Sequence, residues 1–189
     1  MPPGSARRLS ARLFNVKVRT YDSTDREAVI DLDTATPLTT YADVEFHNGS
    51  FTWQEMTLAF PTVKRHDLAQ YLAEDPPGWD CAYLATHNDR VCGFAAGTLR
   101  SWNRRLCLLH MYVDSQMRGQ GIGRALLNTL FNAPESADAQ HVWLETQVDN
   151  VPAIRAYESM GFRIVGLDQT LYGDCPSNDT ALYMSRRLR

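Results

Sequence analysis

The stretch 111–127 constrains this chain most, because an apolar run there meets a glycine-punctuated loop that opens a helical pattern. The loop consists of Arg118, Gly119, Gln120, Gly121, Ile122 and Gly123. Glycines let backbone N–H groups approach an anion closely, and a helix N-terminus adds unpaired donors and a partial positive charge. The stretch therefore predicts an anion-binding turn, with Arg118 and Arg124 as cationic ligands.

Two common phosphate-binding loops do not fit this spacing. A P-loop needs Gly-Lys followed by Ser or Thr, and the chain contains no Gly-Lys. A dinucleotide fingerprint needs G-x-G-x-x-G, whereas the glycines here fall at 119, 121 and 123. The pattern that remains is R-x-x-G-x-G over Arg118, Gly121 and Gly123. A turn that only requires positive φ stays open as an alternative.

The remaining periodicity predicts one mixed α/β sheet with helices on both faces. Strands are expected near 16–21, 39–58 (a hairpin around Asn48-Gly49), 81–86, 91–99, 106–113, 141–148, 162–167 and 181–185, and helices near 23–32, 64–72, 121–131 and 151–160. Ser23 or Thr24 is the expected cap of the first helix, and Gly161 the stop of the last. The crossover from strand 106–113 to strand 141–148 should be parallel and right-handed.

Composition narrows the function classes. The 189 residues suit a single domain over 15–189, after a basic tail over 1–14 that we expect to be disordered. A formal net charge of −3 argues against nucleic acid as the main partner, and no apolar run reaches membrane-spanning length. We expect no metal site and a cytoplasmic protein with buried, reduced thiols at Cys81, Cys92, Cys107 and Cys175.

A second motif lies downstream of the loop. The segment 145–162 passes from a strand into a helix and carries Asn150, Ala153, Tyr157, Gly161 and Phe162. The loop and this segment together resemble the GNAT superfamily of N-acetyltransferases, whose pyrophosphate motif and Asn…Ala-x-x-x-Tyr-x-x-x-Gly-Phe motif they match in order. The resemblance implies an α/β (α+β mixed), GNAT-like acyltransferase fold with a central, mostly antiparallel mixed sheet. It also implies a splay between strands 106–113 and 141–148, and acetyl-CoA as cofactor, with CoA as product.

A narrower resemblance covers about residues 100–185, which are similar to the streptothricin (nourseothricin) acetyltransferases. It is carried by residues 101–106, 141–145, 166–168, 171–172 and 181–185. One departure concerns the acceptor side. That subgroup has two acidic residues in the strand before the loop, where this chain has Leu109 and His110.

The resemblance places the pantetheine arm of the coenzyme in the splay. Contacts are then expected from Met111, Tyr112, Val113, Arg124, Asn150 and Ala153, besides the loop itself. An N–H near Val113 would face the thioester oxygen as an oxyanion-hole donor. Tyr157 is the expected general acid toward the CoA thiolate, with core packing of its ring as the alternative. Asn150 binds the pantetheine amide or caps its helix.

The acceptor amine must be neutral to attack, and a lysine-like amine with a pKa of about 10.4 is neutral in only ~1 in 10³ molecules at pH 7. The candidate general bases are His110, Tyr112 and Glu145. Strand alternation puts His110 and Tyr112 on one face. A hydrogen-bonded structural role for His110 and an ion pair for Glu145 stay open.

Recognition of the acceptor is expected from the N-terminal half. Around the predicted hairpin, a pocket for a cationic amine would use Asp43, Glu45, Trp53 and Glu55, unless they form a solvated face. The expected function is direct acetyl transfer, through a tetrahedral intermediate, to a primary amine of a small molecule such as a streptothricin-like antibiotic. A protein N-terminus or lysine as acceptor, and an acyl-CoA-binding module without turnover, are the alternatives. The protein would act as a monomer or homodimer.

Overall fold

The computed structural model describes residues 15–73, 78–173 and 180–188. The predicted tail over 1–14 and Cys175 therefore lie outside the described residues. Along the chain, the strands and α-helices are β1 (Val16–Thr20), α1 (Arg26–Ile30), β2 (Thr36–His47), β3 (Ser50–Lys64), α2 (Leu68–Tyr71), β4 (Cys81–His87), β5 (Arg90–Arg100), β6 (Arg105–Val113), α3 (Ile122–Phe131), β7 (His141–Gln147), α4 (Val151–Ser159), β8 (Arg163–Asp168) and β9 (Ala181–Arg187). Cys81 and Cys92 are buried and Cys107 is half-buried, all three as free thiols.

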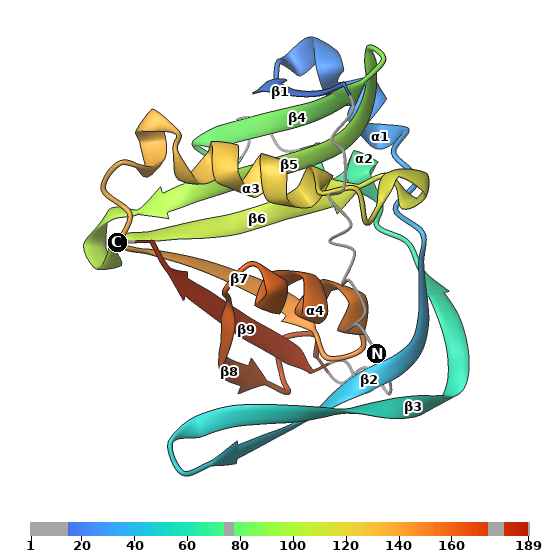
Figure 1. Ribbon diagram of the computed structural model, residues 1–189, viewed down its shortest axis with the longest axis vertical. Coiled ribbons are helices and arrows are strands. Elements are labelled where there is room, and N and C mark those ends of the chain that lie inside the picture. The colour runs from blue at the N-terminus through green and yellow to red at the C-terminus, as the bar shows by residue number, and fades with distance from the viewer. Residues whose placement is uncertain (1–14, 74–77, 174–179, 189) are drawn as a thin grey trace, which may run out of the picture.

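The main sheet is mixed and mostly antiparallel, as predicted. In the described part of the chain its seven strands follow the order β1-β4-β5-β6-β7-β9-β8, and β2 and β3 form a separate hairpin. The neighbours β6 and β7 are parallel, since the chain passes between them through α3. Figure 1 shows β6 and β7 diverging from a shared end, while the β2–β3 hairpin extends from the side of α1 and α2 to the region below α4.

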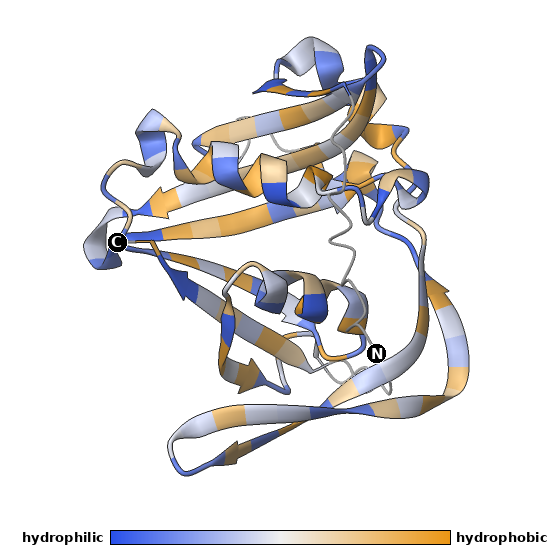
Figure 2. Cartoon of the chain, in the orientation of Figure 1, coloured by the Kyte–Doolittle hydropathy of each residue, from blue (hydrophilic) through white to orange (hydrophobic). Residues whose placement is uncertain are grey.

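Helices cover both faces of this sheet. Val29 of α1 and Leu68 of α2 pack on one face with Phe94 of β5. On the other face, Leu126 of α3 packs against β4 and β5, and Ile154 of α4 belongs to the cluster that includes β6 and β7. Figure 2 shows the matching pattern, with long hydrophobic runs on β5 and β6 and mixed hydropathy on the helices. None of the helices in the described ranges is long and apolar enough to cross a membrane.

The region after the hairpin differs from the predicted helix over 64–72. β3 runs on to Lys64, because the β-branched Thr62 and Val63 stay in the ladder with β2. The helix α2 that follows spans only Leu68–Tyr71, and the side chain of Asp67 caps it. Residues 65–67 therefore lie between a strand end and a short helix, a position that the helical pattern did not indicate.

The predicted helix over 23–32 is a 3-10 turn followed by the short α1, and the residue that caps the turn is Asp22, not Ser23 or Thr24. The Asp22 carboxylate accepts a hydrogen bond from the Thr24 N–H (2.9 Å), and the Asp25 side chain accepts one from the Asp22 N–H (2.9 Å). This reciprocal capping box starts a 3-10 turn over Ser23–Asp25, and α1 continues from it.

Candidate functional site

The splay begins at a bulge in β6. β6 and β7 pair from Arg105 opposite His141 to Leu108 opposite Leu144, and the described pairing ends there. On the other edge of β6 the register with β5 shifts between Leu108 and His110, so Leu109 is the inserted residue. Beyond it the two strands separate, and main-chain groups of the second half of β6 face a gap instead of a neighbouring strand.

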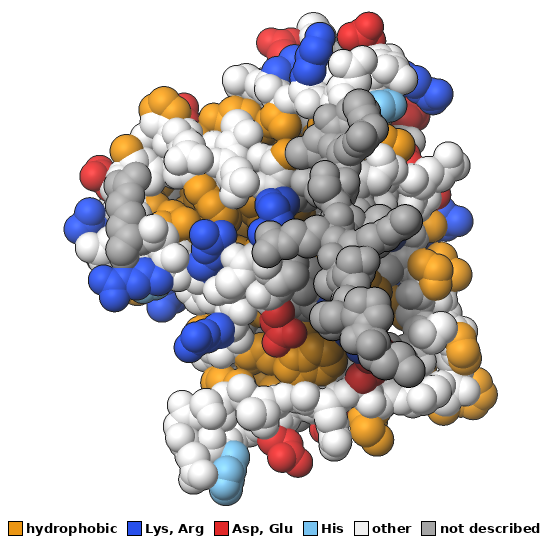
Figure 3. Space-filling model, in the orientation of Figure 1, with side chains coloured by type: hydrophobic (Ala, Val, Ile, Leu, Met, Phe, Trp, Pro, Cys, Tyr) orange, Lys and Arg blue, Asp and Glu red, His pale blue; other side chains and the backbone are white. Residues whose placement is uncertain are grey.

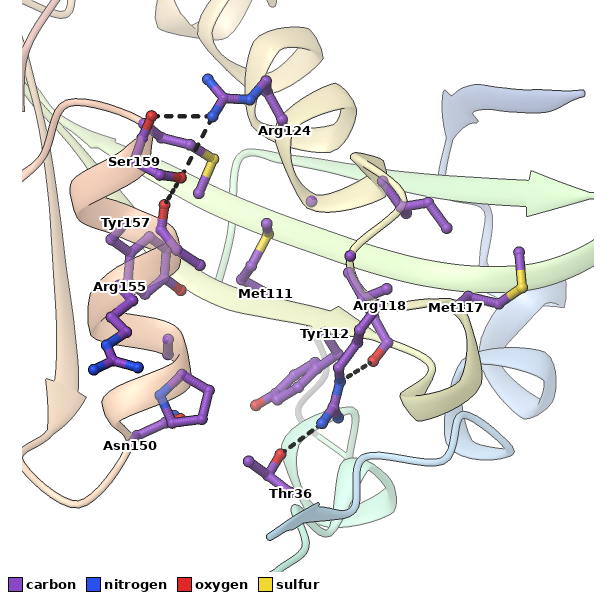
Figure 4. A pocket seen from close by; sticks show the side chains of 18 of the residues that line it. Thr36, Met111, Tyr112, Met117, Arg118, Arg124, Asn150, Arg155, Tyr157 and Ser159 are labelled. Atoms are coloured by element: carbon purple, nitrogen blue, oxygen red, sulfur yellow. Dashed lines mark hydrogen bonds between the residues drawn. The ribbon is translucent and has the colours of Figure 1, made fainter. Parts of the chain in front are cut away.

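A cavity of about 560 Å³ occupies this gap. Its lining includes all but one of the coenzyme-binding residues predicted from the sequence, namely Met111, Tyr112, Val113, Arg118, Gly119, Gly121, Ile122, Gly123, Arg124, Asn150, Ala153 and Tyr157. Gln120 is not among the described residues that line it. Figure 4 shows Met111 and Tyr112 on β6 on one side of the gap and Tyr157 and Asn150 on the side of α4. One cavity therefore brings the two sequence motifs together.

The loop glycines serve two different needs. Gly119 (φ +76°) and Gly121 (φ +85°) adopt the left-handed conformation that favours glycine, and Gly121 is the N-cap residue of α3. At Gly123 a Cβ would lie 2.9 Å from the Met111 Cε, so glycine there permits close packing on β6. Having no side chain, Gly121 leaves the first-turn N–H groups of α3 facing the cavity, where they can bind an anion. The turn interpretation and the anion interpretation are thus compatible.

Arg118 binds the protein's own backbone in this structure, where phosphate ligation was expected. Its guanidinium donates to the Ala35 carbonyl (2.8 Å), the Thr36 hydroxyl (2.9 Å) and the Thr34 carbonyl (3.1 Å), and its Nε donates to the Val113 carbonyl (3.1 Å). These bonds fasten the segment that leads into β2 to the end of β6 and to the loop (Figure 4).

Arg124 connects the two helices that border the cavity. Its guanidinium donates to the Ser159 carbonyl at the end of α4 (3.0 Å). Figure 3 shows further Lys and Arg side chains on the face that carries α3 and α4. Arg155, which also lines the cavity, adds a third guanidinium to its border. Three guanidinium groups therefore line a cavity whose wall also includes the N-terminus of α3.

Tyr157 lies on the α4 side of the cavity and is buried. Burial is the main reason why its pKa is raised above the ordinary tyrosine value, and the nearby charge of Glu145 adds to the effect. The phenol therefore keeps its proton throughout the neutral range. Asn150 precedes α4, and its side-chain amide donates to the Thr146 hydroxyl (3.4 Å) instead of capping the helix.

The predicted bases on β6 lie on the face opposite α3. His110 and Tyr112 share this face as predicted, with ring centroids 6.1 Å apart. His110 is surrounded by the rings of Trp79, Phe94 and Tyr71, and burial lowers its pKa. Burial raises the pKa of Tyr112, so its phenol does not act as a base near neutrality.

Glu145 lies on β7, past the point where the strands separate. Its carboxylate accepts a hydrogen bond from the Tyr172 hydroxyl, which comes from the turn after β8. Burial raises the pKa of Glu145, while Tyr172 and the positive charge of Lys64 act in the opposite direction. The described hydrogen-bond partner of Glu145 is therefore the hydroxyl of Tyr172. The sequence had suggested either an ion pair or a substrate amine as its partner.

The four hairpin residues predicted to bind the acceptor are not among the described residues that line the cavity. The Trp53 indole N–H donates to Glu158 of α4 (2.8 Å), and Glu55 forms an ion pair with Arg155. Asp43 accepts a hydrogen bond from Gln54 (3.3 Å), and Glu45 is exposed. The hairpin is thereby joined to α4, and its acidic side chains lie outside the lining of the gap.

The structure adds residues to the cavity that sequence reasoning missed. They are Thr34, Thr36, His66, Met117, Pro152, Arg155, Ala156, Ser159 and Met160. The residues from α4 were detectable, because positions 152, 155, 156 and 159 follow the i, i+3, i+4, i+7 spacing of one helix face. Thr34, Thr36 and His66 had no such signal, since tertiary contacts carry them to the loop from far away in the sequence.

The comparisons with known proteins agree with this geometry. The profile of the acetyltransferase (GNAT) family matches residues 45–162. The chain is also 34% identical to the streptothricin acetyltransferase of Streptomyces lavendulae, over 85% of this chain and 89% of that protein. The chain belongs to the GNAT acetyltransferase family. The predicted fold and enzyme class are confirmed, as is acetyl-CoA, the donor that enzymes of this family use.

Solved structures place this GNAT acetyltransferase among similar folds. A crystal structure of nourseothricin acetyltransferase is 33% identical and superposes with a TM-score of 0.76, over 92% of this chain and 99% of that one. A Bacillus anthracis protein solved in complex with acetyl coenzyme A shares the fold, with a TM-score of 0.81 at 20% identity over 92% of this chain and all of that one. The ribosomal protein bS18-alanine N-acetyltransferase of Escherichia coli K12 is 26% identical, over 75% of this chain and 85% of that protein.

Proposed function

We propose that this enzyme transfers the acetyl group of acetyl-CoA to a primary amine of a small molecule of the streptothricin class. The observation that carries the proposal is similarity at 33–34% identity, over most of the chain, to enzymes that act on streptothricin and nourseothricin. The relative that acts on a ribosomal protein is more distant, at 26% identity. A small-molecule acceptor is therefore the first choice.

The coenzyme is held where the structure offers donors to an anion. The first turn of α3, at Gly121 and Gly123, would hold its pyrophosphate, because uncapped N–H groups and the helix dipole favour negative charge there. Arg124 at the border adds positive charge. Met111 and Val113 on β6 and Asn150 before α4 line the cavity and would hold the pantetheine arm.

Acetyl transfer then needs one proton donor and one proton acceptor. Tyr157 supplies a proton to the thiol sulfur as the tetrahedral intermediate collapses, since its phenol is protonated at neutral pH. An N–H of β6 near Val113 stabilises the oxyanion, a contact typically worth ~3–4 kcal/mol in the transition state. A base at the splay takes the proton of the amine, because an ammonium nitrogen has no lone pair with which to attack.

The acceptor enters from the side of β6 that carries Tyr112 and His110. Glu145 lies close enough for its charge to raise the pKa values of Tyr112 and Tyr157, so this carboxylate borders the place where a cationic amine would sit. Leu109 and His110 occupy the positions that are acidic in the streptothricin subgroup. Glu145 therefore supplies acidic attraction at the splay.

The test is release of free thiol from acetyl-CoA, measured at several pH values with three kinds of acceptor. Streptothricin should give the highest kcat/KM, a polyamine such as spermidine a lower one, and peptides with free N-termini the lowest. Release that is fastest with peptides would instead support a protein acetyltransferase. Coenzyme binding by calorimetry, with no thiol release on any amine, would support a binding module without turnover.

A further inference from the structure

His66 is an imidazole at the splay that the sequence motifs did not indicate. It follows the end of β3 and lines the cavity together with Tyr112 and Tyr157. Its backbone is fixed by Thr34, since the His66 N–H donates to the Thr34 hydroxyl (2.9 Å) and that hydroxyl donates to the His66 carbonyl (3.3 Å). Its ring centroid is 5.1 Å from that of Tyr112. The ring is therefore held at the acceptor side of the gap.

The base candidates predicted from the sequence are in poorer positions than His66 to take a proton from an amine in the cavity. His110 is enclosed by aromatic rings and is not among the described residues that line the cavity. Tyr112 lines it but keeps its proton. Glu145 accepts the hydroxyl hydrogen of Tyr172 and is also outside the described lining. Among these groups, His66 combines a place in the cavity wall with a side chain that can accept a proton near neutral pH.

We propose that His66 is the general base of acetyl transfer, with its imidazole taking the proton that the acceptor amine loses. The assignment rests on the function proposed above. It adds a catalytic residue from the N-terminal half of the chain, whereas the two family motifs lie in the C-terminal half. The bonds from Thr34 to the backbone of His66 fit this role, because they fix the main chain from which the imidazole lines the cavity.

The charges around His66 favour its neutral form. Burial is the main reason why its pKa is lowered, and the positive charges of Lys64 and of Arg118 in the loop lower it further. Asp149, in the turn between β7 and α4, acts in the opposite direction. The remaining groups that face it are the rings of Tyr71 on α2 and of Tyr112 on β6, with His110 behind them. At pH 7 the ring is therefore neutral and ready to accept a proton.

The proton balance involves two side chains. The acceptor arrives as an ammonium ion and gives one proton to His66. Its nitrogen then forms the C–N bond with the acetyl carbon, the C–S bond breaks, and the sulfur receives the proton of Tyr157. The second proton that leaves the nitrogen restores Tyr157, and His66 releases its proton to water. One acetyl group moves, and one proton enters solution for each turnover.

The experiment compares pH profiles of thiol release for the wild type, His66→Gln and His66→Ala. The wild type should lose activity at acid pH as the base becomes protonated, with a midpoint below the ordinary histidine value, because the pKa of His66 is lowered. His66→Gln should lower kcat by ~10²–10⁴-fold, the usual contribution of a general base, and should lack this acid limb. Added imidazole should restore part of the rate of His66→Ala. His110→Gln should retain the acid limb, and His47→Gln, at the exposed hairpin turn, should match the wild type.

Coenzyme binding and thermal unfolding establish that each variant is folded with its donor site intact. If the wild type releases thiol and His66→Gln keeps both the acid limb and the rate, the base assignment is overturned and the proposed function stands. If His110→Gln or Glu145→Gln alone removes the limb, that residue is the base. If the wild type releases no thiol with any amine, both proposals fail.

Discussion

Tyr157 is the residue where burial sets the chemistry most directly. Its ring packs against Phe162, with centroids 5.5 Å apart, so Tyr157→Phe keeps the packing and removes only the hydroxyl. Because burial raises the pKa of this phenol, its own titration lies above the range of an ordinary assay. We expect kcat to fall by ~10²–10⁴-fold, as for the loss of a general acid, while the acid limb stays in place. Thiol release measured from pH 5.5 to 9 tests this.

A matched control is available on β4. Tyr83→Phe removes the hydroxyl of a half-buried tyrosine that is not among the described residues lining the cavity, and it should leave kcat unchanged. A Tyr157→Phe enzyme with wild-type kcat at every pH would show that water, and not this phenol, protonates the leaving sulfur.

At the scale of single elements, those with a strong repeating pattern were predictable. α3 and α4 have apolar residues at helical spacing, and a glycine with positive φ marks the start of one and the end of the other, at Gly121 and Gly161. The short elements were not predictable in this way. The residues 64–72 look helical, yet pairing with β2 keeps the chain extended to Lys64 and leaves a helix of one turn.

This misassigned boundary is also why one candidate site residue was missed. A helix beginning at Lys64 would have put His66 in its first turn, whereas the extended end of β3 carries it into the cavity wall. The partners of the Arg118 side chain were likewise not predictable from the sequence. Sequence alone indicated a cation beside the loop, but its bonds to Ala35 and Thr36 join residues more than 80 positions apart. Such contacts depend on the tertiary fold, which local patterns do not encode.

The ion pair between Lys64 and Asp149 joins the end of β3 to the turn before α4 (3.4 Å, side chains 22% and 18% exposed). The two charges affect the pKa of His66 in opposite directions. Lys64→Met removes a charge that lowers this pKa, so the acid limb of kcat should move to higher pH. Asp149→Asn removes a charge that raises it, so the limb should move to lower pH. Profiles of kcat at saturating acceptor measure both shifts.

The neighbouring Arg65 supplies the control for this pair. It is exposed and binds Asp33 (2.9 Å), and Arg65→Met should leave the limb where it is. Shifts of Lys64→Met and Asp149→Asn in the same direction, or none in either, would contradict the electrostatic account of His66. Urea unfolding with an unchanged m-value would establish that the compactness of each variant is unaltered.

At the scale of the whole molecule, the cavity is formed by two halves of the sheet that are paired at one end of β6 and β7 and separate beyond it. The walls are α3 with β6 on one side and α4 on the other, and Arg124 reaches Ser159 between them. The hairpin spans the same opening, from the bonds of Arg118 at its base to the ion pair of Glu55 with Arg155 on α4. A ligand in the cavity would contact both halves, so its binding should stabilise the fold as a unit.

Coenzyme binding should therefore raise the unfolding temperature, and two glycines allow a matched test. At 100 times Kd, CoA adds ~2.7 kcal/mol to the free energy of unfolding, which corresponds to about 5–10 °C for a domain of this size.

Gly121 and Gly49 have nearly the same positive φ, +85° and +80°, but Gly121 starts α3 at the cavity whereas Gly49 lies in the hairpin turn. Alanine at either position should lower the unfolding temperature of the free protein through backbone strain, a cost of ~1–2 kcal/mol. Gly49→Ala should keep the full increase with CoA, while Gly121→Ala should lose most of it, because the first-turn N–H groups would no longer present the same geometry to the pyrophosphate. An equal CoA-dependent increase in both variants would place the pyrophosphate somewhere other than the N-terminus of α3.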